Sequence, residues 1–210
     1  MIFHVSFRIM RKNLIIILTY FFPFCGLGRG IRHLRNTYAR ENKLHNALLL
    51  DVGCASGFSM SIIKKFFKGS SIGLDINPFM CRTAKKTGLY QDVVLGDASR
   101  PPFANKFDYC IAFEVIEHLS KRDGYMILKN LRSISRNVIL TTPNGFHARR
   151  DSRFGWSHIS GWYAHEIHGY YGYRVYVAPG LQGRTPLNSY HLGYNSHISL
   201  EFTLCQNLSW

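Results

Sequence analysis

The chain alternates between short apolar runs and longer stretches in which apolar residues recur every three or four positions. Four runs have the length of a strand and occupy residues 47–52, 71–74, 92–95 and 109–113. A helix is predicted over 57–67, and another begins near Pro78, because proline favours the first helical turn. Strands that alternate with helices predict a parallel sheet with helices on both faces.

The second half of the chain continues this alternation. Residues 196–205 alternate strictly between apolar and polar side chains, which is typical of a half-buried strand. The stretch 178–195 is rich in Gly, Pro and Tyr and predicts a loop. The other elements predicted here are a helix over 121–133, a strand over 137–141, a helix over 162–168 and a strand over 173–177.

The loop after the first predicted strand consists of small residues. Residues 48–59 read LLLDVGCASGFS, in which an apolar run ends at Asp51 and a helical pattern follows. Small residues let the backbone approach a ligand closely, and the helix N-terminus offers free N–H groups. The loop therefore predicts a ligand site, and its small residues are Gly53, Cys54, Ala55 and Gly57.

Carboxylates stand near the ends of the following strands. Asp75 lies about 20 residues beyond the loop, where a nucleotide-binding sheet places the acid that binds ribose hydroxyls. Asp97 closes the third run, and Glu114 follows the fourth. The chain has only 12 acidic residues, so their concentration at strand ends indicates that several of them have a function.

Four segments in order, LDVGCASG, GLDIN, GDASRPPFANKFDYCIAFEVIEHL and VILTTPNG, resemble the motifs of class I S-adenosylmethionine-dependent methyltransferases. The similarity is to the group with a methyltransferase type 11 domain, which includes the ubiquinone and menaquinone biosynthesis enzymes. It covers about 47–145 and extends more weakly, through HISGW and YGYRVY, to about 177. The resemblance implies a Rossmann-like, doubly wound α/β fold, with a mostly parallel seven-stranded sheet and an antiparallel last strand.

The resemblance also implies S-adenosylmethionine as cofactor and a role for each motif residue. The small-residue loop would form a wall against the methionine part of the cofactor, and Asp51 would lie beneath it and help to fix the amino group. Ala55 departs from the family, which often has glycine at this position, and its methyl group would narrow the loop. The remaining cofactor-binding residues are Asp75 with Ile76 at the ribose, Asp97 with Ala98 at the adenine edge, and Phe113 with Glu114 on the sulfonium side.

Methyl transfer from a sulfonium mainly requires alignment and exclusion of water, but an oxygen nucleophile also needs a base. His118 follows the strand that lines the site and is the first candidate, and His158 in HISGW is the second. A structural role is the alternative interpretation for each. We expect no metal, because His165 and His168 share a helical face without a further acid or cysteine ligand. The magnesium-binding acids of catechol-type methyltransferases are not recognisable either.

The net charge of +14 is compatible with a solvated surface, but it also favours an anionic membrane face or a nucleic acid as partner. Segment 1–46 is strongly basic and contains an apolar stretch, 14–24, that is too short to span a bilayer. It predicts either a lid packed on the domain at 47–210 or a helix in the membrane interface. Five scattered cysteines without a CxxC motif predict reduced thiols in the cytoplasm.

Together these features predict O- or C-methylation of a small-molecule or lipid-linked acceptor without metal. An RNA or protein methyltransferase and a non-catalytic module with the same fold are the alternatives. A DNA-base amino methyltransferase is not expected, since FEVIEH stands where such enzymes carry an Asn/Asp-Pro-Pro-aromatic motif. The sequence contains no recognisable code for the acceptor or for the oligomeric state.

Overall fold

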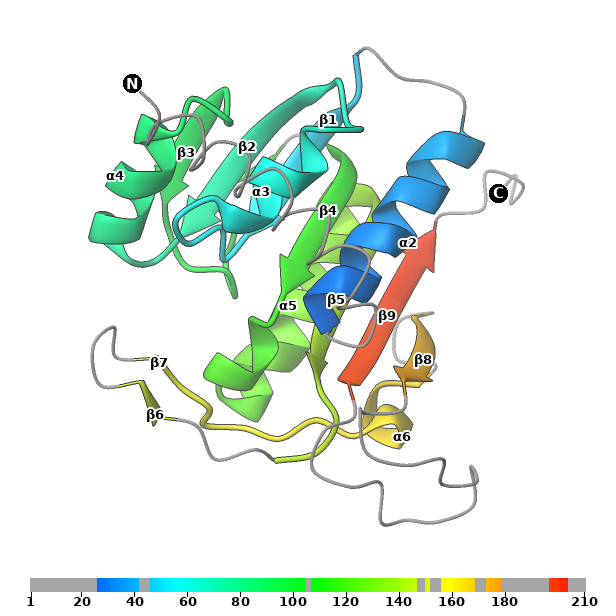
Figure 1. Ribbon diagram of the computed structural model, residues 1–210. Coiled ribbons are helices and arrows are strands. Elements are labelled where there is room, and N and C mark those ends of the chain that lie inside the picture. The colour runs from blue at the N-terminus through cyan, green and yellow to red at the C-terminus, as the bar shows by residue number, and fades with distance from the viewer. Residues whose placement is uncertain are drawn as a thin grey trace, which may run out of the picture.

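The computed structural model describes residues 26–41, 46–104, 107–146, 150–151, 156–168, 173–178 and 197–203. Their main feature is one seven-stranded sheet in the order β3-β2-β1-β4-β5-β9-β8 (Figure 1). The strands are β1 (Leu48–Val52), β2 (Ser70–Asp75), β3 (Asp92–Leu95), β4 (Phe107–Phe113), β5 (Ser135–Pro143), β8 (Arg174–Ala178) and β9 (His197–Thr203).

The first five strands run parallel to one another, so their carboxyl ends meet at one edge of the sheet. Strand β9 is inserted between β5 and β8 and is antiparallel to both. From β1 the chain first adds β2 and β3 on one side and then β4 and β5 on the other, so the strand order reverses beside β1. In such sheets ligands bind at the carboxyl edge near that point. The prediction of a Rossmann-like, doubly wound sheet is confirmed.

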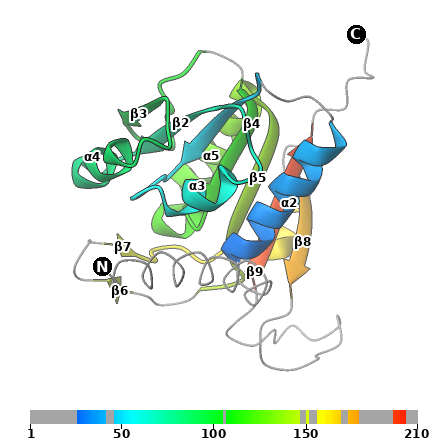
Figure 2. The same cartoon turned by 45° about the horizontal axis from the view of Figure 1, so that its top comes forward.

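Helices cover both faces of the sheet (Figure 2). On one face, α2 (Gly26–Arg40) and α3 (Phe58–Ile63) pack on alternate residues of the central strands, among them Leu49, Ile111 and Ile139. On the other face, α5 (Lys121–Ile134) packs on the intervening residues, among them Leu50 and Leu140. The near-continuous apolar runs in the sequence arise because these strands are buried on both sides.

Two side-chain caps fix where helices begin. The Asn77 side chain accepts hydrogen bonds from the backbone N–H groups of Phe79 and Met80, and it starts α4 (Pro78–Lys86) at the predicted proline. Ser120 caps α5 through the backbone N–H of Asp123, at 3.1 Å. Both starts agree with the sequence-based prediction.

Other boundaries differ from the prediction. Helix α3 ends at Ile63 rather than near 67, because the chain turns there to enter β2 at Ser70. Strand β5 continues to Pro143, because β9 pairs with it along that whole length. Helix α6 (Ala164–Ile167) is shorter than predicted, since Trp162 forms β-bridges with 144–145 instead.

Between β5 and α6 the structure describes a small two-stranded sheet, β6 (Arg150–Asp151) with β7 (Trp156–Ser157). The apolar stretch 14–24 and nearly all of the predicted loop 178–195 lie outside the described residues. Among the helices that the structure describes, none combines the length and the hydropathy needed to cross a membrane.

Candidate functional site

The small-residue loop turns sharply between β1 and α3 at the carboxyl edge of the sheet. Gly53, Ala55 and Gly57 have φ values of 67°, 46° and 84°, which lie in the left-handed region. Glycine adopts this region readily, whereas the methyl group of Ala55 makes it costly there. The backbone N–H groups of Gly53 and Cys54 both donate to the carbonyl oxygen of Leu74, which ties the loop to the end of β2.

Asp75 fixes the same loop from the side of β2. One carboxylate oxygen accepts a 2.8 Å hydrogen bond from the backbone N–H of Ala55, and the other accepts one of 2.8 Å from Asn77. The predicted ribose-binding acid thus bridges the loop and the start of α4. The next residue, Ile76, is 72% exposed and offers an apolar side chain to a ligand beside this carboxylate.

Asp51 lies under the loop and is 2% exposed. Its Oδ2 accepts a 2.7 Å hydrogen bond from the hydroxyl of Tyr90. Burial raises the pKa of Asp51 to about 7, the Tyr90 hydrogen bond opposes this rise, and the nearby charge of Asp75 adds to it. Asp51 therefore changes charge near neutral pH.

Tyr90 is a site residue that the sequence-based reasoning missed. A Cβ atom added at Gly57 or at Gly73 would contact its ring. The ring therefore fills the space under the loop. Burial and the proximity of Asp51 raise the pKa of its hydroxyl, which stays protonated as a donor. Tyr90 comes from the turn between α4 and β3, where no sequence pattern marks it.

Asp97 and Ala98 follow β3 at the next position along the edge. The backbone N–H of Gly96 donates to the carbonyl oxygen of Asp75, at 2.9 Å, which sets the ends of β2 and β3 side by side. The Asp97 side chain is exposed, and its Oδ1 accepts from the backbone N–H of Ser99. Ala98 packs against the core on the α5 face.

Phe113 and Glu114 close β4. The Phe113 ring is buried and lies so close to Gly30 of α2 that a side chain there would overlap it. Glu114 has a φ of 57°, and its Oε1 accepts a 2.9 Å hydrogen bond from the hydroxyl of Thr141. A left-handed residue other than glycine after a strand at this edge is a strained conformation of the kind found at functional sites.

The two candidate histidines lie together, although 40 residues separate them in the chain. The rings of His118 and His158 have centroids 4.9 Å apart and are nearly perpendicular. His118 belongs to the short 3-10 helix η1 (Ile116–His118), and its Nδ1 lies 3.0 Å from the carbonyl oxygen of Ser157. Because a carbonyl only accepts, Nδ1 carries the proton.

The segment that carries His158 is docked on η1 by backbone hydrogen bonds. The N–H groups of Ile159 and Ser160 both donate to the carbonyl oxygen of Glu117. The buried indole of Trp162 donates to the carbonyl oxygen of Ile116, at 3.1 Å. These contacts bring the histidines to one place beyond the end of β4.

The histidines of α6 have other surroundings. The ring of His165 stacks on Tyr163, with the centroids 5.7 Å apart. The carboxylate of Glu166 accepts from the Lys121 ammonium at 2.6 Å, and this ion pair lowers the pKa of Glu166. Glu166 therefore joins α6 to α5.

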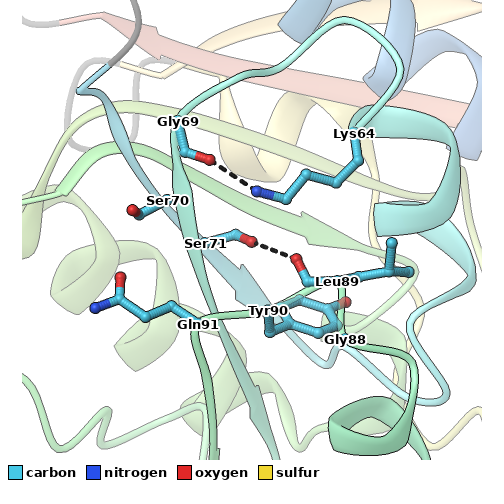
Figure 3. A pocket seen from close by; sticks show the side chains of 8 residues that line it. All are labelled: Lys64, Gly69, Ser70, Ser71, Gly88, Leu89, Tyr90 and Gln91. Atoms are coloured by element: carbon cyan, nitrogen blue, oxygen red, sulfur yellow. Dashed lines mark hydrogen bonds between the residues drawn. The ribbon is translucent and has the colours of Figure 1, made fainter.

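A hollow of about 440 Å³ lies at the other edge of the sheet, where β2 begins (Figure 3). In it Lys64 donates to the carbonyl oxygen of Gly69, and the Ser71 hydroxyl donates to that of Leu89. None of its lining residues is a predicted cofactor residue, although one of them, Tyr90, donates a hydrogen bond to Asp51. Its lining residues are Lys64, Gly69, Ser70, Ser71, Gly88, Leu89, Tyr90 and Gln91.

Residues 49–137 match the family model described as "Methyltransferase domain". No curated protein sequence matches the chain. The chain is similar to a solved S-adenosylmethionine-dependent methyltransferase from Clostridium acetobutylicum, with a TM-score of 0.64, 12% identity and coverage of 92% of this chain and 98% of that one.

Two other solved structures are also similar. The magnesium protoporphyrin IX methyltransferase from Synechocystis PCC 6803, with bound SAM, gives a TM-score of 0.53 and 17% identity, with coverage of 84% of this chain and 81% of that one. The small RNA methyltransferase HEN1 gives a TM-score of 0.60 and 18% identity, with coverage of 87% of this chain and 25% of that one.

Residues 49–137 thus match a methyltransferase domain, and the fold of the chain is that of the solved S-adenosylmethionine-dependent methyltransferases. Its cofactor is S-adenosylmethionine. Asp75 carries carboxylate oxygens of the kind that accept hydrogen bonds from ribose hydroxyls, and Asp51 carries a carboxylate of the kind that pairs with an ammonium group. The two carboxylates belong to adjacent strands, β1 and β2, at the edge where the backbone loop lies.

Proposed function

We propose that this chain transfers the methyl group of S-adenosylmethionine to an oxygen or carbon of a small-molecule or lipid-linked acceptor. The observation that carries the proposal is the pair His118 and His158, whose rings lie 4.9 Å apart just beyond the end of β4. Phe113 and Glu114 close that strand, where the methyl-bearing sulfur is expected. A proton acceptor there suits a hydroxyl that becomes a nucleophile.

The bound cofactor supplies an electrophilic methyl group on a sulfonium. The acceptor hydroxyl gives its proton to Nε2 of His118, whose Nδ1–H donates to the carbonyl oxygen of Ser157 and so fixes the ring and supports the imidazolium. The acceptor oxygen then forms a bond to the methyl carbon. The carbon–sulfur bond breaks with its electron pair going to sulfur, which leaves S-adenosylhomocysteine and a methyl ether.

Exposed large apolar side chains in the segment that carries His158, and just after β5, support an apolar acceptor. Ile159 follows His158 directly, and Phe146 contacts the backbone at Gly161. Ile159 is 61% exposed, Phe146 is 53% exposed and Tyr163 is 47% exposed. Large apolar side chains on one surface are typical of a binding site for an apolar molecule.

We extend the proposal to a peripheral contact between segment 1–46 and an anionic membrane. Within it, α2 exposes Arg32, Arg35 and Arg40 to solvent. Arginines near an anionic surface are each worth about 1 kcal/mol of attraction. Binding to phosphatidylserine vesicles that weakens with salt supports this contact, whereas equal binding to neutral vesicles contradicts it.

The charge of +14 favours RNA as a second candidate acceptor. One experiment separates the candidates: the full chain is incubated with S-adenosylmethionine labelled in the methyl group and with lipid, metabolite and RNA fractions. We expect label in the lipid or metabolite fraction, and Asp75→Ala should abolish it. Label in RNA alone supports the second candidate. A failure to bind S-adenosylmethionine in calorimetry contradicts both.

A further inference from the structure

Two histidines and one carboxylate converge at the end of β4, in the part of the chain that the structure describes. Glu117, His118 and His158 each offer one ligand atom, and these three atoms lie within 4.8 Å of one another. Ligand atoms around tetrahedral zinc lie about 3.4 Å apart, given bonds of about 2.1 Å. Small side-chain rotations therefore suffice to bring the three atoms around one ion.

We propose that Glu117, His118 and His158 form a divalent transition-metal site that binds and acidifies the acceptor hydroxyl. The inference rests on the proposed function, which it deepens by selecting oxygen as the methylated atom. It departs from the sequence-based expectation of catalysis without metal. The two histidines then serve as ligands, and water takes the proton that the hydroxyl loses.

Each ligand is held by a further contact of the kind that supports metal ligands. The Nδ1–H of His118 donates to the carbonyl oxygen of Ser157, so the neutral ring carries its lone pair on Nε2. A metal-bound histidine usually donates its other N–H to a carbonyl or carboxylate in this way. The hydroxyl of Thr142 donates to Oε2 of Glu117, at 2.9 Å, and fixes the carboxylate.

The backbone of the site is also rigid. The carbonyl oxygen of Glu117 accepts from the N–H groups of Ile159 and Ser160, which holds the strand of chain that carries His158 against η1. The indole N–H of Trp162 also holds η1 in place through its hydrogen bond to the carbonyl oxygen of Ile116. Ligands from two distant segments are therefore placed before any ion binds, which lowers the cost of binding it.

The carboxylate of Glu117 lies away from solvent, which is compatible with metal coordination. Glu117 is only 2% exposed. A buried carboxylate is costly unless it is paired with a cation or coordinates a metal. Imidazole nitrogens suit zinc, iron and similar ions, whereas magnesium and calcium prefer oxygen ligands. Three protein ligands leave a further position for an acceptor oxygen, as in catalytic zinc sites.

The test uses the full chain without a histidine tag, freed of metal with a chelator and dialysed. Zn²⁺ is titrated by calorimetry, Mn²⁺ by electron paramagnetic resonance and Co²⁺ by its visible absorption. We expect one ion per chain for the wild type and for His165→Ala, the control histidine. Glu117→Gln, His118→Asn and His158→Ala should weaken binding by at least about tenfold. His118→Asn keeps an N–H that can donate to Ser157.

Thermal unfolding identifies which variants are folded, and only these are compared. Failure of the wild type to bind any of the three ions overturns the inference, as does unchanged affinity in the folded variants. S-adenosylmethionine binding is measured on the same samples. Cofactor binding without ion binding overturns this inference and leaves the proposed function standing. Ion binding without cofactor binding overturns the proposed function instead. Methyl transfer by metal-free enzyme at the wild-type rate overturns the role in acidifying the hydroxyl.

Discussion

The hydroxyl of Tyr90 donates a 2.7 Å hydrogen bond to the buried carboxylate of Asp51, beneath the loop that follows β1. The hydrogen bond orients the Asp51 carboxylate, and the charge of this group depends on burial, on this donor and on the neighbouring charge of Asp75. The pair links the turn before β3 to the cofactor edge of the sheet. If Asp51 contacts the positively charged cofactor as the family resemblance implies, cofactor binding should depend on pH.

Cofactor affinity should rise with pH. Burial raises the pKa of Asp51 to about 7, so this carboxylate, which we expect to attract the amino group of the cofactor, is largely protonated at pH 6 and ionised at pH 8. Calorimetry with S-adenosylmethionine should show tighter binding at pH 8 than at pH 6. Asp51→Asn should remove most of this difference, and an equally steep profile in that variant would contradict the assignment.

The same shift predicts how stability depends on pH. The folded state raises the pKa of Asp51 from 3.8 to about 7, so the stability that this group contributes is fully present below pH 3.8 and is lost as pH rises through 7. The loss amounts to at most about 4 kcal/mol. Urea unfolding at pH 5 and pH 8 should show that Asp51→Asn gains stability over the wild type mainly at pH 8.

Tyr90→Phe should raise the pKa of Asp51 further. Loss of the hydroxyl removes the hydrogen bond that favours the ionised carboxylate, so the pH midpoint of cofactor binding should move upward. We also expect about 1–2 kcal/mol of lost stability at pH 8. Tyr173→Phe is the matched control, because it loses a buried hydrogen bond to the carbonyl oxygen of Leu128 and none to Asp51. An identical midpoint in both variants would argue against the pair.

Opposite substitutions in the loop should have opposite effects. Ala55→Gly removes a methyl group from a residue with φ of 46° and should stabilise the protein by up to about 1 kcal/mol. Gly57→Ala adds one at φ of 84°, only 3.1 Å from the ring of Tyr90, and should destabilise it by about 1 kcal/mol or more. Chemical denaturation measures both. A loss of stability in Ala55→Gly would show that the loop does not hold this conformation.

Gly30→Ala should separate α2 from the sheet. Its new carbon would lie 2.4 Å from the ring of Phe113, which is buried and cannot move aside without cost. We expect a loss of about 1–3 kcal/mol in unfolding free energy. Arg32→Ala, on the exposed side of α2, should change it by less than about 0.5 kcal/mol. Equal effects would mean that α2 does not pack on Phe113.

The pattern of apolar residues was sufficient to predict the strands. The strand at 92–95 was predicted with its observed bounds. The predicted strands at 47–52 and 109–113 end where β1 and β4 end, and their first residues differ by one and two positions. Strands β1 and β4 are buried on both faces and are therefore mostly apolar, so their sequence identifies them. Boundaries that depend on a distant partner, such as the extension of β5 along β9, leave no local signal.

The sequence by itself determined the sheet, the glycine-rich turn and the carboxylates that follow its strands, since each of these depends on neighbours within a few residues. Tertiary structure alone decided that Tyr90 reaches Asp51 and that His118 meets His158. Both contacts join segments about 40 residues apart. Their formation depends on how β1, β4 and the following loops pack, which no short-range pattern of residues encodes.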